Sequence, residues 1–184
     1  MNLAREQFKT LSDIYEQDNI MDLIERNNVK VVIAGDLEGK LKTAFPDVRD
    51  GFLKIQERTK NNTQMTMYLC FAYDSIIDYN QAVEKNEEEG RGEEGRGELS
   101  LGEEREKLFE KLMVPRYIDI LIRTSGESRL SNYMLMQASY GMIYIEKNLW
   151  PAFNMLSLAK ILLQYNYHFN DIHTKKLKFM GKAL

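Results

Sequence analysis

Two arginines, Arg123 and Arg129, stand on either side of a Ser-Gly-Glu turn in the stretch RTSGESRLS. Guanidinium groups make paired, charge-assisted hydrogen bonds, and two of them close together suit a phosphate or a diphosphate. Ser131 adds a hydroxyl that can donate to the same anion, and Glu127 can hold one guanidinium in place. These residue types at this spacing predict an anion-binding site. The residues alone leave one alternative open, a surface network of arginine and glutamate side chains.

The elements around this stretch favour the anion site. The preceding run, RYIDILI, is short, apolar and rich in β-branched residues, which is typical of a buried strand. From Leu130 onward, side chains recur at helical spacing, which predicts a helix around residues 130–139, with Gly126 in the turn before it. Ligands of α/β proteins bind where a strand ends and a helix begins, and a helix N-terminus attracts anions. Arg129 would oppose the helix dipole there unless an anion lay between them.

Periodicity predicts the remaining elements along the chain. Amphipathic helices are expected between Leu3 and Arg26. Further strands are expected at 29–35, 64–73 and within 141–150, and further helices at 48–60, 74–85 and 155–166. Strands that alternate with helices predict an α/β fold, namely an open, mostly parallel sheet flanked by helices.

The composition sets the outer limits. The chain has 184 residues, 43% of them hydrophobic, so a single domain over residues 1–184 is expected. A net charge of -3 argues against general binding of nucleic acid. The chain has no apolar run of the roughly 18 residues that a spanning helix needs, so any membrane contact is expected to be peripheral. One cysteine, Cys70, lies in an apolar run and is expected to be a reduced thiol in a cytosolic compartment.

Residues 84–106 differ from the rest of the chain. They contain ten acidic and four basic side chains, a tandem EEGRG repeat and no aromatic residue. A segment with so little apolar surface cannot offset the entropy of ordering itself. We therefore predict a disordered, acidic insert, with an acidic docking segment as the alternative.

The stretch DILIRTSGESRLSNYMLMQAS, followed by LWPAF, resembles the last signature block of the cis-prenyltransferases. VVIAGDL, ERTKNNT and LCFAYDS follow the order and approximate spacing of the same family. The resemblance covers nearly the whole chain except the acidic insert. It implies that Arg123, Arg129 and Ser131 bind the diphosphate of isopentenyl diphosphate, with Glu127 as a weaker supporting residue.

Within that family, FAYDS and LWPAFNMLSLAKILLQYNYHF look more like the eukaryotic dehydrodolichyl diphosphate synthases than the bacterial enzymes. This resemblance implies an enzyme that condenses isopentenyl diphosphate with an allylic polyprenyl diphosphate for dolichol synthesis, with the help of Mg²⁺. It also implies a peripheral position on the cytoplasmic side of the endoplasmic reticulum membrane. The expected assembly is a homodimer, or a heteromer with a Nogo-B-receptor-like subunit.

The sequence departs from the family pattern in its motifs. The opening block, which contains His-x-x-Met-Asp-Gly-Asn and supplies the aspartate for Mg²⁺, is absent, as are the Phe-Ser-x-Glu-Asn-like block and the C-terminal Arg-x-Gly. Met142 stands where bacterial members have a glutamate.

No catalytic residue or metal ligand can be assigned. No cysteine or acidic residue joins His168 and His173 to complete a set of metal ligands. We therefore expect no chain elongation by this polypeptide alone. A non-catalytic partner subunit and a truncated, inactive fragment remain the alternatives.

Overall fold

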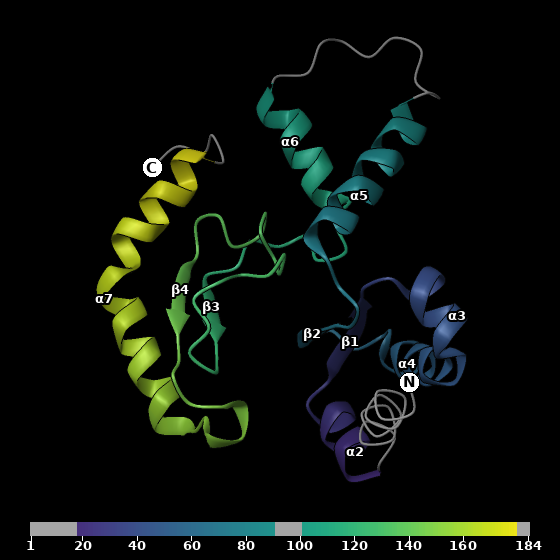
Figure 1. Ribbon diagram of the computed structural model, residues 1–184, viewed down its shortest axis with the longest axis horizontal. Helices are drawn as coiled ribbons and strands as arrows, with labels where there is room; N and C mark the ends of the chain where they lie inside the picture. The colour runs from purple at the N-terminus through teal and green to yellow at the C-terminus, as the bar shows by residue number, and fades with distance from the viewer. Residues whose placement is uncertain (1–17, 91–100, 180–184) are drawn as a thin grey trace. The chain divides into compact units, whose positions relative to one another are not determined.

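The computed structural model describes residues 18–90 and 101–179. The chain divides into two compact units, Met1–Tyr73 and Asp74–Leu184. In the described ranges, each unit contains two parallel strands accompanied by helices (Figure 1). This alternation confirms the predicted α/β class with parallel strands flanked by helices. The single domain over residues 1–184 stays a prediction.

The first unit alternates helices with strands β1 and β2. Its described elements are α2 (Asp18–Arg26), β1 (Val29–Ala34), the π-helix η1 (Leu37–Leu41), α3 (Lys42–Ala44), α4 (Pro46–Thr59) and β2 (Met65–Cys70). The two strands run parallel, from Val29 opposite Met65 to Ala34 opposite Cys70. The strands predicted at 29–35 and 64–73 and the helix predicted at 48–60 are confirmed. Of the helices predicted from Leu3 to Arg26, only α2 falls within the described residues.

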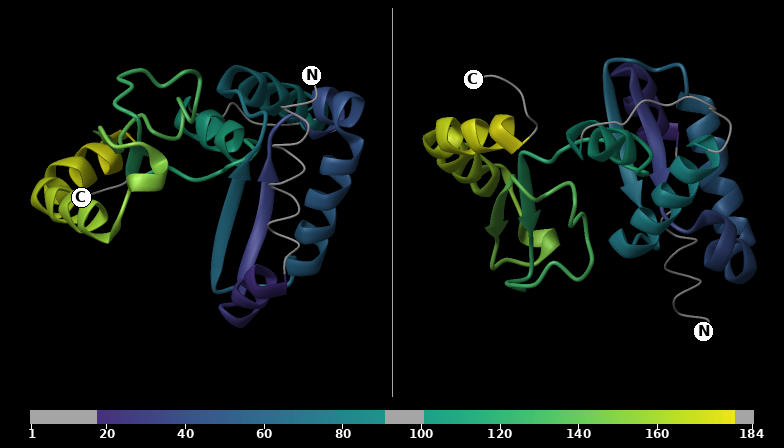
Figure 2. Two further views of the ribbon diagram at one scale, coloured as in Figure 1. Left: turned by 60° about the horizontal axis from the view of Figure 1, so that its bottom comes forward. Right: turned by 90° about the horizontal axis from the view of Figure 1, so that it is seen from above.

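The core of the first unit lies where α4 packs along β1, as Figure 2 shows. Phe52 of α4 is only 2% exposed, and its ring is tilted against that of Phe71 with the centroids 5.1 Å apart. Apolar residues of α4 at positions 48, 52 and 55 face the strand, which is the spacing of one helix face. Burial of this stripe is the main source of stability for the unit.

Side chains of α4 also satisfy backbone donors of β1. The hydroxyl of Thr59 accepts a hydrogen bond from Val31 N at 3.0 Å, and Gln56 Oε1 accepts one from Ile33 N at 2.9 Å. A strand edge without such partners would leave its N–H groups unpaired. The helix therefore both covers the face of β1 and provides acceptors for two of its N–H groups.

Gly35 ends β1 at a point where no other residue fits. Its φ is +152°, and a Cβ atom placed there would lie 1.7 Å from the carbonyl oxygen of Phe71. Glycine alone allows the backbone after β1 to approach the chain after β2 so closely.

The second unit contains the predicted anion-binding stretch. Its described elements are α5 (Ser75–Gly90), α6 (Leu101–Glu110), β3 (Ile120–Arg123), β4 (Met142–Ile145), the 3-10 helix η2 (Trp150–Ala152) and α7 (Met155–Phe179). β3 and β4 run parallel, from Ile120 opposite Met142 to Arg123 opposite Ile145. The helix α7 packs against β4 (Figure 1) and extends well beyond the predicted range of 155–166. None of the described helices is both long and apolar enough to cross a bilayer.

The helix predicted around residues 130–139 is wrong. Residues 131–140 form successive turns, and Ser131, Asn132 and Met134 have φ values of +50°, +57° and +52°. A right-handed helix requires negative φ, so three such residues exclude one. The backbone of the segment instead bonds to the first turn of α5, where Ser75 N donates to Asn132 O at 2.8 Å. Arg129 therefore does not lie in a helical first turn, and the helix-dipole argument for it fails.

The described parts of the segment predicted to be a disordered insert, residues 84–106, are helical. Residues 84–90 belong to α5 and residues 101–106 to α6, while residues 91–100 lie outside the described ranges. Glutamate is a good helix former, and the helices gain contacts that composition does not reveal. Lys111 Nζ lies 2.6 Å from Glu89 Oε1, and Phe109 is buried with its ring stacked on Tyr117. These contacts offset the ordering entropy at both ends of the segment.

Candidate functional site

The site begins where β3 ends. Arg123 is the last residue of the strand, and its carbonyl accepts a hydrogen bond from Glu146 N at 2.7 Å. The next turn has Ser125 at φ +73° and Gly126 at φ +69°. Gly126 N donates to Glu146 O at 2.9 Å. This double left-handed turn redirects the chain sharply and ties it to the segment after β4, so the backbone at Arg123 is held in place.

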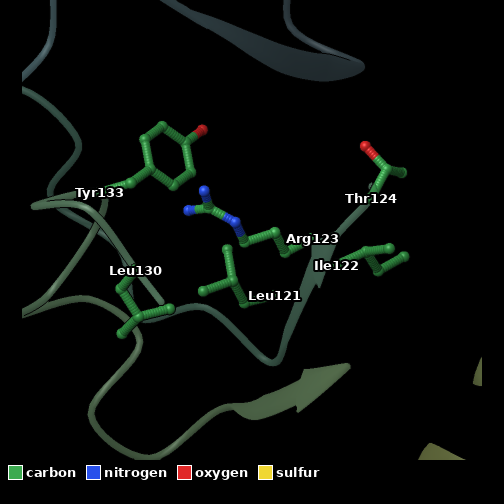
Figure 3. A pocket seen from close by; sticks show the side chains of 6 residues that line it. All are labelled: Leu121, Ile122, Arg123, Thr124, Leu130 and Tyr133. Carbon is green, nitrogen blue, oxygen red and sulfur yellow. The ribbon is translucent and has the colours of Figure 1, made fainter. Parts of the chain in front are cut away.

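A cavity of about 290 Å³ opens beside the end of β3. Its walls are Leu121, Ile122, Arg123, Thr124, Leu130 and Tyr133 (Figure 3). The guanidinium of Arg123 points between the ring of Tyr133 and the side chain of Leu130. The cavity combines apolar walls with the guanidinium of Arg123 and the hydroxyl groups of Thr124 and Tyr133. Such a lining suits a small ligand with an anionic end and an apolar end.

The other predicted residues lie on the turn segment beside this cavity. Arg129 and Ser131 are exposed and flank Leu130 along the chain, but neither lines the cavity. Arg129 Nη1 lies 2.9 Å from Glu127 Oε2, so Glu127 does pair with a guanidinium as expected. The structure thus places Arg123 in the cavity wall and Arg129 and Ser131 on the adjoining chain. Their joint action on one anion stays a prediction.

Sequence reasoning missed two polar side chains of the cavity. Thr124 directly follows the strand, a position at which ligand-binding residues of α/β folds are common, so the sequence did hold a signal for it. Tyr133 was placed on a helix, and only the turn conformation of the segment brings its ring beside Arg123 (Figure 3).

The ion pair between Glu127 and Arg129 is exposed, with 71% of the Arg129 side chain and 43% of the Glu127 side chain accessible to solvent. Exposed pairs contribute roughly 0–1 kcal/mol, because water screens the charges and both side chains lose freedom. We expect Glu127→Gln to change the free energy of unfolding by less than about 1 kcal/mol. Urea unfolding of both proteins measures this difference. A larger decrease in the free energy of unfolding would show that Glu127 stabilises the turn and does not only orient Arg129.

Metal ligands do not gather in the described part of the chain. Among residues 18–90 and 101–179, no three side chains of His, Cys, Asp or Glu lie together as a site built from protein ligands alone would require. Mg²⁺ is commonly held by one or two carboxylates together with substrate phosphates, so the Mg²⁺ that the resemblance implies stays a prediction.

The described residues form an α/β fold with parallel strands, and Arg123 lines a cavity at the end of β3. The sequence model of one family, described as putative undecaprenyl diphosphate synthase, matches residues 1–171. The chain belongs to this family of prenyltransferases, as the signature block predicted.

Individual relatives agree with this assignment. An isoprenyl transferase of Thermotoga maritima is 31% identical over 88% of this chain and 67% of its own length. The human dehydrodolichyl diphosphate synthase complex subunit is 31% identical over 90% of this chain and 46% of its own length. The crystal structure of a probable undecaprenyl diphosphate synthase from Campylobacter jejuni gives a TM-score of 0.69 at 23% identity, covering 88% of this chain and 72% of that one. The chain thus spans between 46% and 67% of the length of these two curated relatives.

Proposed function

We propose that this chain takes part in cis-prenyl transfer of the dehydrodolichyl type, in which isopentenyl diphosphate is joined to an allylic polyprenyl diphosphate. The observation that carries the proposal is the guanidinium of Arg123 in the wall of a cavity whose other walls are largely apolar (Figure 3). Isopentenyl diphosphate has a matching shape, with a diphosphate at one end and a five-carbon apolar tail at the other.

The roles of the chain's own residues follow from these positions. Arg123 would bind the diphosphate through its paired donors, and Arg129 and Ser131 would add contacts from the adjoining turn. Leu121 and Leu130 would cover the apolar tail and exclude water from it. Burial of five carbons contributes about 4 kcal/mol at about 0.8 kcal/mol per carbon, enough to distinguish the substrate from free diphosphate.

The dolichol branch is supported by sequence likeness. A Schizosaccharomyces pombe dehydrodolichyl diphosphate synthase complex subunit is 32% identical over 82% of this chain. The bacterial isoprenyl transferase of Thermotoga maritima is about as similar, so the argument for this branch lies in the FAYDS and LWPAF motifs. With this branch we also propose a peripheral position on the cytoplasmic side of the endoplasmic reticulum. The proposed assembly is a homodimer or a heteromer with a Nogo-B-receptor-like subunit.

The proposal is tested in two steps. Calorimetric titration of the purified chain with isopentenyl diphosphate is expected to show saturable binding that inorganic diphosphate reduces by competition. Radiolabelled isopentenyl diphosphate, an allylic diphosphate and Mg²⁺ are then incubated with the chain alone and with a partner subunit. We expect polyprenyl product in the second incubation only, because no catalytic residue can be assigned among the family motifs that this chain contains. Absence of binding would contradict the proposed function, and binding without product in either incubation would favour a non-catalytic subunit.

A further inference from the structure

The turn segment 130–135, which carries Leu130, Ser131 and Tyr133 beside the cavity, has an unfavourable backbone conformation. Ser131, Asn132 and Met134 all have positive φ, which residues with a Cβ atom rarely adopt. Such conformations persist only where the surrounding structure determines them, and they concentrate at functional sites. Something outside the segment must therefore hold it.

The start of α5 makes the required contacts. Ser75 N donates to Asn132 O at 2.8 Å, and the Ser75 hydroxyl accepts a hydrogen bond from Leu135 N at 3.0 Å. Asn132 Nδ2 donates to Asp74 Oδ2 at 3.2 Å. Three hydrogen bonds thus join Asp74 and Ser75 to the part of the segment with positive φ. Ser75 is only 4% exposed, so water has little access to the two bonds that Ser75 itself makes.

Helix physics explains why α5 provides such contacts. The first N–H groups of a helix have no acceptor within the helix and must bond elsewhere. Asp74 Oδ1 accepts from Ile76 N at 2.8 Å, in the manner of a helix cap, while its second oxygen remains directed at Asn132. The carbonyl of Asn132 satisfies the N–H of Ser75. The helix start and the turn segment therefore complete each other's hydrogen bonding.

A second anchor fixes the chain just after the segment, at Gln137. Gln137 Nε2 donates to Asp78 Oδ2 at 3.4 Å, and Ile118 N donates to Gln137 O at 2.9 Å. Asp78 is 1% exposed and also accepts from Met113 N at 2.8 Å. The turn segment is thus held at two points by α5, one helical turn apart, which restricts its movement as a unit.

We propose that Asp74 and Ser75 are positioning residues for the diphosphate site. They touch no ligand, and they act by holding Leu130 and Tyr133 in the cavity wall beside Arg123. This inference rests on the proposed function, because isopentenyl diphosphate is the ligand whose binding reports the position of the segment.

The test uses a charge-matched pair, Asp74→Asn and Asp74→Ala. Both remove the negative charge, but the asparagine keeps an oxygen that accepts from Ile76 N and an NH₂ group that can donate to Asn132 Oδ1 once the Asn132 amide turns over, whereas alanine keeps neither. In calorimetric titrations with isopentenyl diphosphate, we expect Asp74→Asn to bind at least as tightly as the natural chain. Asp74→Ala is expected to bind about tenfold more weakly than Asp74→Asn, as for loss of one or two hydrogen bonds.

Ser75→Ala provides an independent variant, since it removes the acceptor of Leu135 N, and it is also expected to bind about tenfold more weakly. Ser139→Ala is the matched control. The Ser139 hydroxyl bonds only to carbonyls of its own segment in the described hydrogen bonds, at 2.8 Å to Met136 O and 3.1 Å to Leu135 O, and we expect unchanged affinity.

The outcomes separate the two proposals. A natural chain that does not bind isopentenyl diphosphate contradicts the proposed function. The positioning role alone is overturned by a different result. In that case the natural chain binds isopentenyl diphosphate, Asp74→Ala and Asp74→Asn bind it with equal affinity, and Ser75→Ala binds it as tightly as the natural chain. Far-UV circular dichroism checks each variant for folding. If Asp74→Ala does not fold, the comparison of Ser75→Ala with Ser139→Ala tests the positioning role instead. Weaker binding of isopentenyl diphosphate by Ser75→Ala supports the role, and equal binding overturns it.

Discussion

Arg123→Ala is expected to weaken the binding of isopentenyl diphosphate by about 2 kcal/mol or more, which is about 30-fold in the dissociation constant. The guanidinium lies in the cavity wall between Tyr133 and Leu130 (Figure 3), and loss of a charge-assisted contact in a partly buried site has this magnitude. The free energy of unfolding should change little, because the backbone of Arg123 pairs with β4 regardless of its side chain.

Three further variants sharpen this result. Arg123→Lys is expected to restore binding only in part, since an ammonium cannot form the paired contact of a guanidinium. Arg129→Ala is predicted to cost about 2 kcal/mol if the diphosphate draws Arg129 away from Glu127. Arg116→Ala removes an exposed arginine outside the cavity wall and is the matched control, with unchanged affinity expected. Titrations in which Arg123→Ala binds as tightly as Arg116→Ala would contradict the assignment of the site.

Phe52→Ala is expected to lower the free energy of unfolding of the first unit by about 3–5 kcal/mol. The side chain is 2% exposed and packs against Phe71 inside the cluster that joins α4 to β1. Its removal loses the transfer free energy of the ring and leaves a cavity that the neighbouring side chains can close only in part.

The control for Phe52→Ala is Lys54→Ala, two residues along the same helix, where the side chain is exposed. This substitution should change the free energy of unfolding by less than about 0.5 kcal/mol, because no buried contact is lost. Urea unfolding followed by far-UV circular dichroism measures both variants. Equal midpoints for the two would show that Phe52 is not part of a stabilising core.

The local spacing of apolar residues was sufficient to predict most of the secondary structure. The strand at residues 29–35 and the helix at 48–60 were predicted because apolar side chains recur with the period of each structure, and both elements bury that face in the fold. The RTSGESRLS motif identified the family without any structure, since so specific a spacing of arginines, serines and glycine rarely arises from packing alone. The sequence by itself therefore determined the fold class and the family, while the binding roles of Arg123 and Arg129 stay predictions.

The tertiary structure decided the conformation of the segment that completes the site. Leu130, Tyr133 and Met134 have helical spacing, but hydrogen bonds to Ser75 and Asp74, more than 50 positions away in the sequence, hold this chain in turns with positive φ. No local pattern reports a contact at such a separation. The same long-range contacts bring Tyr133 beside Arg123 and make Leu130 part of the cavity wall (Figure 3). Local propensity thus yields here to backbone groups that find better partners in α5 than in a helix of their own.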